Sequence, residues 1–177
     1  QFKKPCHRCN DIALLKLVSP ARLDKVFVEP ICISKNPIKD IGYTPGHSSN
    51  QRAWVAGWGT SIAKPFVFSQ AKHLQHLQVP LQELPFCKER KKEYPDPNMI
   101  FCAGGEAGKD TCRGDSGGPL MLAAKSHEWY SIGIVSFGNT FCGAAGSQSV
   151  FTNVNYYLPW IEACMNDDQK CLQPLSG

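Results

Sequence analysis

The sequence predicts an all-β fold, built as a barrel or a sandwich. Its apolar runs are short and residues that form turns separate them, since the 177-residue chain contains 15 Gly and 13 Pro. Short strands at regular spacing, with turn residues between them, are typical of all-β domains. Hydrophobic residues make up 42% of the chain and charged residues 19%, a composition that favours a globular chain over a disordered one.

Several segments carry a strand signal and one carries a helix signal. The apolar run from Asp11 to Val18 predicts a buried strand. The other predicted strands cover residues 53–60, 76–79, 119–123, 130–136 and 149–154, with a polar turn over 125–128. Apolar residues near helical spacing predict a helix over 155–166, with Pro159 in its first turn. The charged stretch within 84–94 is interpreted as a short solvated helix or a loop.

Nine cysteines favour an oxidising compartment, and hence a secreted protein with disulfide bonds. Because nine is an odd number, at least one cysteine is free or bonded outside the chain. Cys6 and Cys9 form the single Cys-x-x-Cys unit, and one such pair does not close a structural metal site. We therefore predict no metal and no other cofactor. A formal net charge of +4 gives no reason to expect a nucleic-acid partner, and no apolar run is long enough for a membrane span.

Ser116 lies in the most informative segment, Asp110-Thr-Cys-Arg-Gly-Asp-Ser-Gly-Gly-Pro119. Glycines on both sides let the backbone turn sharply and expose N–H groups. Exposed N–H groups beside a serine are what an oxyanion hole requires, and a nucleophilic hydroxyl also needs a base that a third group orients. Without further information, a glycine-rich turn with no chemistry is an equal alternative.

The segment Gly-Asp-Ser-Gly-Gly-Pro resembles the active-site signature of the chymotrypsin/trypsin family of serine proteases. The resemblance continues in family order through residues 10–15, 54–59, 101–104, 133–138, 150–154 and 160–161. It implies the two-barrel chymotrypsin-like fold, here with an incomplete first barrel, a complete second barrel and a C-terminal helix. The implied parts are a first-barrel remnant (1–33), a linker (34–50), the second barrel with its helix (51–164) and a tail (165–177).

The same resemblance assigns the catalytic roles. Ser116 would be the nucleophile and Asp11 the aspartate of the triad, while the N–H groups of Gly114 and Ser116 would form the oxyanion hole. Asp115 would pair with an N-terminal amine that cleavage of a zymogen releases. Arg113, beside the oxyanion glycine, either favours acidic substrate residues or is a solvated loop arginine.

The resemblance also outlines a substrate pocket. Asp110 would lie at its base, where a carboxylate favours a substrate Arg or Lys, so we predict cleavage after these residues. Ser136, Phe137 and Gly138 would line the pocket, and Gly138 would leave one wall open to a long side chain. Ser149 stands where trypsin-like members usually have glycine, and it would either narrow the pocket or bind a guanidinium.

The family pattern further implies disulfides from Cys87 to Cys102 and from Cys112 to Cys142. The family pattern includes a third bridge whose two cysteines are both replaced here, by Ala53 and Leu122. Cys32 stands where activated members often bind a second chain through a disulfide. No partner is assigned to the four remaining cysteines, Cys6, Cys9, Cys164 and Cys171.

The general base of the triad is missing. In this family the histidine precedes the aspartate by some tens of residues, whereas only His7 precedes Asp11, in an unrelated Cys-His-Arg-Cys context. We therefore expect the chain to come from a processed or truncated product, with only residual catalysis of roughly 10³–10⁴-fold over water. The predicted function of the full-length parent is a secreted, zymogen-derived serine endopeptidase whose partners are polypeptide substrates and protein inhibitors. The alternative is a non-catalytic protease homologue that acts as a binding or regulatory module.

Overall fold

The computed structural model describes residues 9–24, 26–37, 41–42, 51–61, 69–82, 94, 96–138 and 141–167. Within them, one antiparallel sheet has the strand order β2-β1-β4-β5-β6-β3. The strands are β1 (Arg52–Gly57), β2 (Gln75–Pro80), β3 (Ile100–Gly104), β4 (Pro119–Ala123), β5 (Trp129–Phe137) and β6 (Gln148–Asn153). The predicted all-β class is confirmed, and every predicted strand from residue 53 onward forms.

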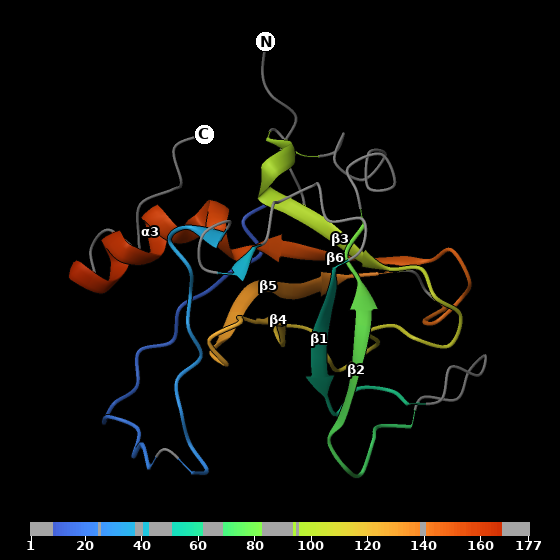
Figure 1. Cartoon of the computed structure of the whole chain (residues 1–177), viewed down its shortest axis with the longest axis horizontal. Helices are drawn as coiled ribbons and strands as arrows, with labels where there is room; N and C mark the ends of the chain where they lie inside the picture. Colours follow the sequence, from blue (N-terminus) through green and yellow to red (C-terminus); the bar gives the residue numbers. More distant parts are fainter. Residues whose placement is uncertain are drawn as a thin grey trace.

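The sheet closes on itself into a barrel. β1 and β2 run across the direction of β5 and β6 in Figure 1, as expected for a strongly curled sheet. The two edge strands then meet, because Leu81, just after β2, forms an antiparallel bridge with Ala103 of β3. The N–H of Gln82 also donates to the carbonyl of Cys102 at 3.0 Å. Closure satisfies backbone groups that would otherwise remain unpaired at the sheet edges.

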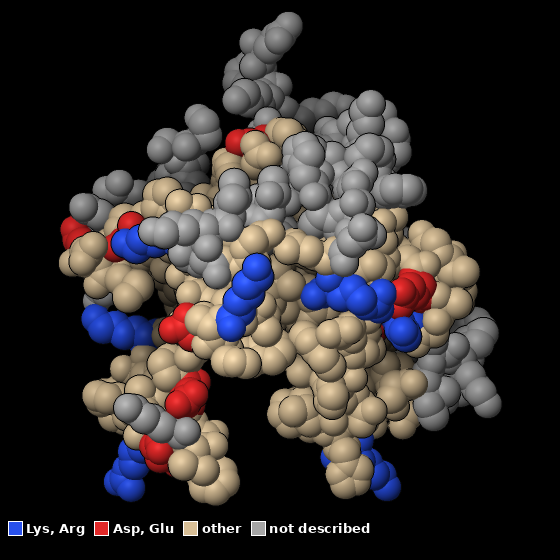
Figure 2. All heavy atoms as spheres, viewed as in Figure 1, with Lys and Arg blue, Asp and Glu red and all other residues tan. Residues whose placement is uncertain are grey.

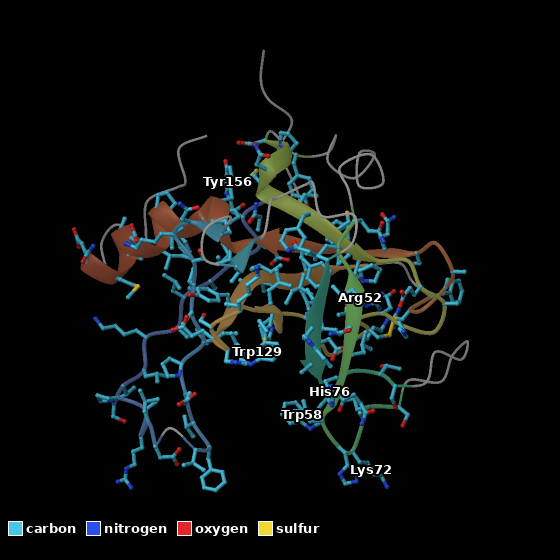
Figure 3. All side chains as sticks on the ribbon, viewed as in Figure 1. Arg52, Trp58, Lys72, His76, Trp129 and Tyr156 are labelled. Atoms are coloured by element: carbon cyan, nitrogen blue, oxygen red, sulfur yellow. A yellow bond between two sulfur atoms is a disulfide. The ribbon has the colours of Figure 1, made fainter. Side chains whose placement is uncertain are left out.

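In β1, successive side chains point alternately into the barrel and toward its outer face. Ala53 and Val55 are buried, while Trp54 between them is only half-buried. On the outer face, the Trp54 ring lies between His76 and Trp129, with ring centroids 5.3 and 6.4 Å away. His76 and Trp129 are labelled in Figure 3, on opposite sides of β1.

The barrel interior is one apolar cluster to which every strand of the sheet contributes. Its buried members are Ala53, Val55, Val79, Leu81, Phe101, Ala103, Leu120, Leu122, Ile132, Val135 and Phe151. The rings of Phe101 and Phe151 stack with centroids 5.8 Å apart. Ala53 and Leu122, which replace the two cysteines of the family bridge, both belong to this cluster.

A second cluster joins the barrel to the helix α3 (Val154–Asn166), which confirms the predicted C-terminal helix. The side chain of Asn153 caps its first turn by accepting from the N–H of Asn155 at 3.2 Å. Pro159 lies in the second turn and not in the first, because the helix begins earlier than the sequence pattern indicates. Tyr157, on the buried face of α3, belongs to this cluster.

The predicted buried strand over Asp11–Val18 is wrong. These residues form no strand, and Leu15 and Val18 are 90% and 108% exposed. Figure 1 shows the chain leaving the barrel here as an extended arm, and Figure 2 shows open space between this arm and the body. The reason is that no described strand lies beside the segment to accept its hydrogen bonds or cover its apolar side chains. The arm returns at Cys32, which forms a parallel bridge with Tyr130 of β5.

β3 was not predicted as a strand, because its five residues are all buried and do not alternate. A short 3-10 helix, η1 (Pro97–Met99), precedes it. The predicted feature over 84–94 lies outside the described residues except for Tyr94. Basic and acidic side chains are interspersed on the face in Figure 2. None of the helices in the described part of the chain has the length and apolar character that crossing a bilayer requires.

Candidate active site

Ser116 lies in the loop between β3 and β4, and β5 holds this loop in place. The N–H of Gly117 donates to the carbonyl of Val135, and the N–H of Val135 donates to the carbonyl of Gly118, both at 2.9 Å. Within the loop, the N–H of Asp115 donates to the carbonyl of Cys112 at 3.0 Å, which closes a tight turn just before the serine. Ser116 itself is exposed. The loop therefore presents the hydroxyl to solvent on a backbone that is fixed from both sides.

The peptide between Arg113 and Gly114 has the orientation that an oxyanion hole needs. The carbonyl of Arg113 accepts from the N–H of Thr60 at 2.9 Å and from the Thr60 hydroxyl at 3.3 Å. In a trans peptide the N–H points opposite to the carbonyl, so the N–H of Gly114 faces away from Thr60. Neither this N–H nor that of Ser116 donates to any acceptor within the described residues. Gly114 has φ +98°, a conformation that favours glycine.

Asp115 turns away from Ser116 and supports the loop from behind. Its carboxylate accepts from the N–H of Gly59 at 2.8 Å and from the N–H of Cys112 at 2.9 Å. A Cβ at Gly57 or Gly59 would lie 2.1 or 2.5 Å from Asp115 Oδ1, so only glycine fits at either position. The carboxylate lines a cavity of about 370 Å³ that Asp110 also lines, and His76 is the one basic side chain among its described lining residues.

The fold brings Asp11 next to the Ser116 loop. The hydroxyl of Ser136, 125 residues further along the chain, donates to Asp11 Oδ2 at 2.5 Å. The hydroxyl of Thr152 donates to the backbone carbonyl of Asp11 at 2.8 Å. Ser136 lies on β5 and lines the same cavity as Ser116. Asp11 is therefore anchored through β5 and β6 although the rest of its segment is not part of the sheet.

Tyr157 holds the residue beside Asp11. Its hydroxyl donates to Asn10 Oδ1 at 3.1 Å, and Asn10 has φ +58°. Burial raises the pKa of Tyr157 to about 12, so this donor keeps its proton at physiological pH. Together with Thr60 and Thr152, Tyr157 is a positioning residue that sequence reasoning missed. Each is a hydroxyl donor to a distant segment, and nothing local in the sequence marks such a contact.

A slot of about 300 Å³ opens beside Ser116. Its lining includes Thr111, Arg113, Ser116, Ser136, Phe137 and Gly138. The predicted disulfide between Cys112 and Cys142 is confirmed and joins two of its walls, with the Cα atoms 5.6 Å apart. The structure thus collects on one slot most of the residues that the sequence assigned to substrate binding.

Asp110 lines the neighbouring cavity of about 370 Å³, not the slot itself, and its carboxylate is hydrogen-bonded to the buried Ser149. Asp110 Oδ1 accepts from the Ser149 hydroxyl at 2.6 Å and from the N–H of Thr111 at 2.9 Å. Asp110 Oδ2 accepts from the N–H of Gly143 at 3.2 Å. The hydroxyl of Thr111 donates to Ser149 Oγ at 3.0 Å. Ser149 therefore directs its proton at the pocket carboxylate.

The other cysteine predictions are partly outside the described residues. Cys102 is disulfide-bonded, but its expected partner Cys87 lies outside them. Cys9 and Cys164, for which no partner was assigned, are also disulfide-bonded. Cys32 is the free cysteine of the described part of the chain, and it is half-buried.

Comparison with known proteins identifies the family of this chain. The chain matches the family model described as Trypsin over residues 2–161. It is 39% identical to a phenoloxidase-activating enzyme of Bombyx mori over 90% of this chain and 36% of that protein. It is 37% identical to a proclotting enzyme of Tachypleus tridentatus over 86% of this chain and 38% of that protein. It is 35% identical to serine protease 41 of Homo sapiens over 89% of this chain and 48% of that protein.

This chain thus spans between about a third and a half of the length of these relatives, from 36% to 48%. The family match, by contrast, covers nearly all of the chain. The barrel closed by β2 and β3 and the C-terminal helix agree with that match. The chain belongs to the trypsin family of serine proteases and has the chymotrypsin-like fold with a partial first barrel.

Proposed function

We propose that the full-length protein containing this chain is a secreted serine endopeptidase that hydrolyses polypeptides after Arg or Lys. The observation that carries the proposal is the position of Ser116. Its exposed hydroxyl lines a slot, and in the same loop lie the N–H groups of Gly114 and Ser116, which have no acceptor among the described residues. Hydrogen-bond donors that are fixed before the reaction begins stabilise developing negative charge most effectively.

The proposed chemistry is acyl transfer through an ester of Ser116. Ser116 Oγ attacks the substrate carbonyl carbon while its proton passes to a general base. The carbonyl oxygen becomes an oxyanion that accepts from the N–H groups of Gly114 and Ser116. The C–N bond then breaks, and the base returns the proton to the leaving amine. A water molecule hydrolyses the ester by the same route and restores the serine hydroxyl.

The general base is proposed to be a histidine from a part of the protein outside this chain. Asp11 would orient this histidine and stabilise its protonated form. The bond from Ser136 supports that role, because it fixes the Asp11 carboxylate beside the slot. We expect this chain by itself to show only residual catalysis.

Activation from a zymogen is the proposed role of Asp115. The cavity behind the oxyanion loop contains two carboxylates, Asp110 and Asp115, and no Lys or Arg among its described lining residues. An N-terminal ammonium inserted there would be attracted to Asp115 and would hold the loop in its present shape. Protein inhibitors would bind across the same slot, and Cys32 is proposed to bind a second chain through a disulfide, since its thiol is free.

Labelling by a fluorophosphonate tests the nucleophile directly. We expect the activated full-length protein to be labelled at Ser116 and the Ser116→Ala variant to remain unlabelled. Asp11→Asn should lower kcat by about 10⁴-fold, because the base would lose its orientation. Asp24→Asn, on the exposed arm, is the matched control and should leave the rate unchanged.

The second candidate is a non-catalytic homologue that binds polypeptides in the slot. It is favoured by one observation, namely that no histidine of the described residues lines the slot beside Ser116. The two candidates differ in one outcome. If the activated full-length protein binds a peptide in the slot but neither reacts with the fluorophosphonate nor hydrolyses the peptide, the homologue is correct and the endopeptidase is not.

A further inference from the structure

The Asp110 carboxylate, in the cavity next to the slot, already has most of its acceptor capacity in use. A carboxylate oxygen accepts about two hydrogen bonds. Asp110 Oδ1 accepts two, from the Ser149 hydroxyl and from the N–H of Thr111, at 2.6 and 2.9 Å. Oδ2 accepts one longer bond, 3.2 Å, from the N–H of Gly143. Among the described residues, one lone pair on Oδ2 is therefore left for a substrate.

Ser149 also packs directly behind the slot wall formed by Gly138. It is 1% exposed, so its hydroxyl is fixed among neighbours. A Cβ built on Gly138, on the slot wall, would lie only 2.7 Å from Ser149 Oγ, which shows how closely the two segments approach. Asp110 itself lines the cavity behind the slot, whereas Thr111 lines both. The carboxylate therefore lies beyond the wall where Gly138 and Ser149 are in contact, and Thr111 stands between the slot and the cavity.

We infer that this slot selects Lys over Arg before the scissile bond, because Ser149 occupies the carboxylate oxygen that a guanidinium would need. The inference rests on the proposed protease function and sharpens its substrate class. A guanidinium binds a carboxylate best as a planar fork with two parallel N–H···O bonds, one to each oxygen. With Oδ1 already accepting two bonds, only one such bond is left. The planar group must also reach beyond the wall where Gly138 and Ser149 are in contact.

A lysine ammonium suits the same site better. It is compact, it sits on a flexible unbranched stem, and its three N–H donors need separate acceptors rather than a fork. The remaining lone pair of Asp110 Oδ2 supplies one. The hydroxyl of Thr111 supplies another, because its proton is directed at Ser149 Oγ and its lone pairs are free to accept. Thr111 is thereby a specificity-determining residue for lysine.

The first experiment measures hydrolysis by the activated full-length protein. Two peptide amides that differ only in Lys or Arg before the cut are compared by kcat/KM. We expect the Lys peptide to be preferred by roughly tenfold to a hundredfold, the value of one charged hydrogen bond. Ser149→Gly should raise kcat/KM for Arg by a similar factor and remove the preference. Ser126→Gly is the matched control, since Ser126 is exposed, lies in the turn before β5 and donates its hydroxyl to Glu128.

A second variant keeps the test independent of Ser149. Thr111→Val should lower kcat/KM for the Lys peptide at least about tenfold, because one ammonium acceptor is lost. The Arg peptide should change by less than about threefold. Equal losses for both peptides, or a wild-type preference for Arg, would overturn the inference and leave the protease function standing.

Equilibrium binding separates this inference from the proposed function. Titration of the full-length Ser116→Ala protein with n-butylamine and n-butylguanidine needs no catalysis. If neither peptide is hydrolysed by the wild-type protein but the amine binds more tightly, the protease function fails and the selectivity of the slot stands. If the guanidine binds as tightly as the amine or more tightly, the inference is wrong whatever the hydrolysis shows.

Discussion

Gly59→Ala should disturb the loop that carries Ser116, although Gly59 does not line the Ser116 slot. A Cβ at this position would lie 2.5 Å from both oxygens of Asp115. Carbon and oxygen do not approach so closely without repulsion, so the carboxylate has to move by about 1 Å. That movement breaks or stretches its bonds from the N–H groups of Gly59 and Cys112, which are 2.8 and 2.9 Å long.

The size of the effect follows from these two bonds. A hydrogen bond to a charged group contributes about 1.5–3 kcal/mol, so losing both costs about 3–6 kcal/mol. If the loss destabilises the ordered loop relative to its disordered form, the equilibrium constant for ordering falls by roughly 10²–10⁴-fold. Fluorophosphonate labelling of Ser116 in the activated full-length protein should slow by at least about 10²-fold.

Two comparisons make the test specific. Gly42→Ala is the matched control, because Gly42 has φ +63° and open space around its missing Cβ. It should cost about 1–2 kcal/mol of backbone strain and leave the labelling rate unchanged. In an Asp115→Ala background, Gly59→Ala should add no further loss, since the group it displaces is gone. Losses that add in full would refute the proposed route from Gly59 through Asp115.

Three further predictions concern stability and are tested by unfolding of the full-length protein. Phe151→Ala should lower the free energy of unfolding by about 3–5 kcal/mol, because Phe151 is fully buried in the barrel; a loss below about 1 kcal/mol in urea titrations would contradict the packing. Replacing both Cys112 and Cys142 with serine should lower the free energy of unfolding by about 3.5 kcal/mol, because the disulfide closes a loop of 30 residues in the unfolded chain. Equal urea midpoints for the oxidised wild type and the double variant would contradict this prediction. Arg52 holds the pKa of Glu106 at about 2, below its ordinary 4.5. This ion pair therefore stabilises the fold fully above about pH 4.5, and its contribution is lost as the pH falls to about 2. The melting temperatures of wild type and Glu106→Gln should differ at pH 6 and converge near pH 2, whereas a constant gap would exclude the pair as its cause.

Much of the barrel could be predicted from local sequence. The strands β1, β2, β4, β5 and β6 follow runs whose alternation or length favours strands, and α3 follows apolar residues at helical spacing. β3 could not be predicted in this way, because a fully buried strand at a barrel seam does not alternate. The segment 11–18 shows the opposite error. Its apolar run favours a strand, but a strand forms only where a neighbour accepts its hydrogen bonds.

The candidate site, too, could be predicted only in part from the sequence. The glycines around Ser116 predict a tight turn, which bonds to β5 and from Gly59 then hold in place, and the family pattern predicts the pairing of Cys112 with Cys142. Only the tertiary structure decided that Ser136 holds Asp11 across 125 residues, and that the Ser149 hydroxyl is directed at Asp110. The physical reason is that a hydroxyl carries one proton, and which distant acceptor receives it depends on where the closed barrel places both groups.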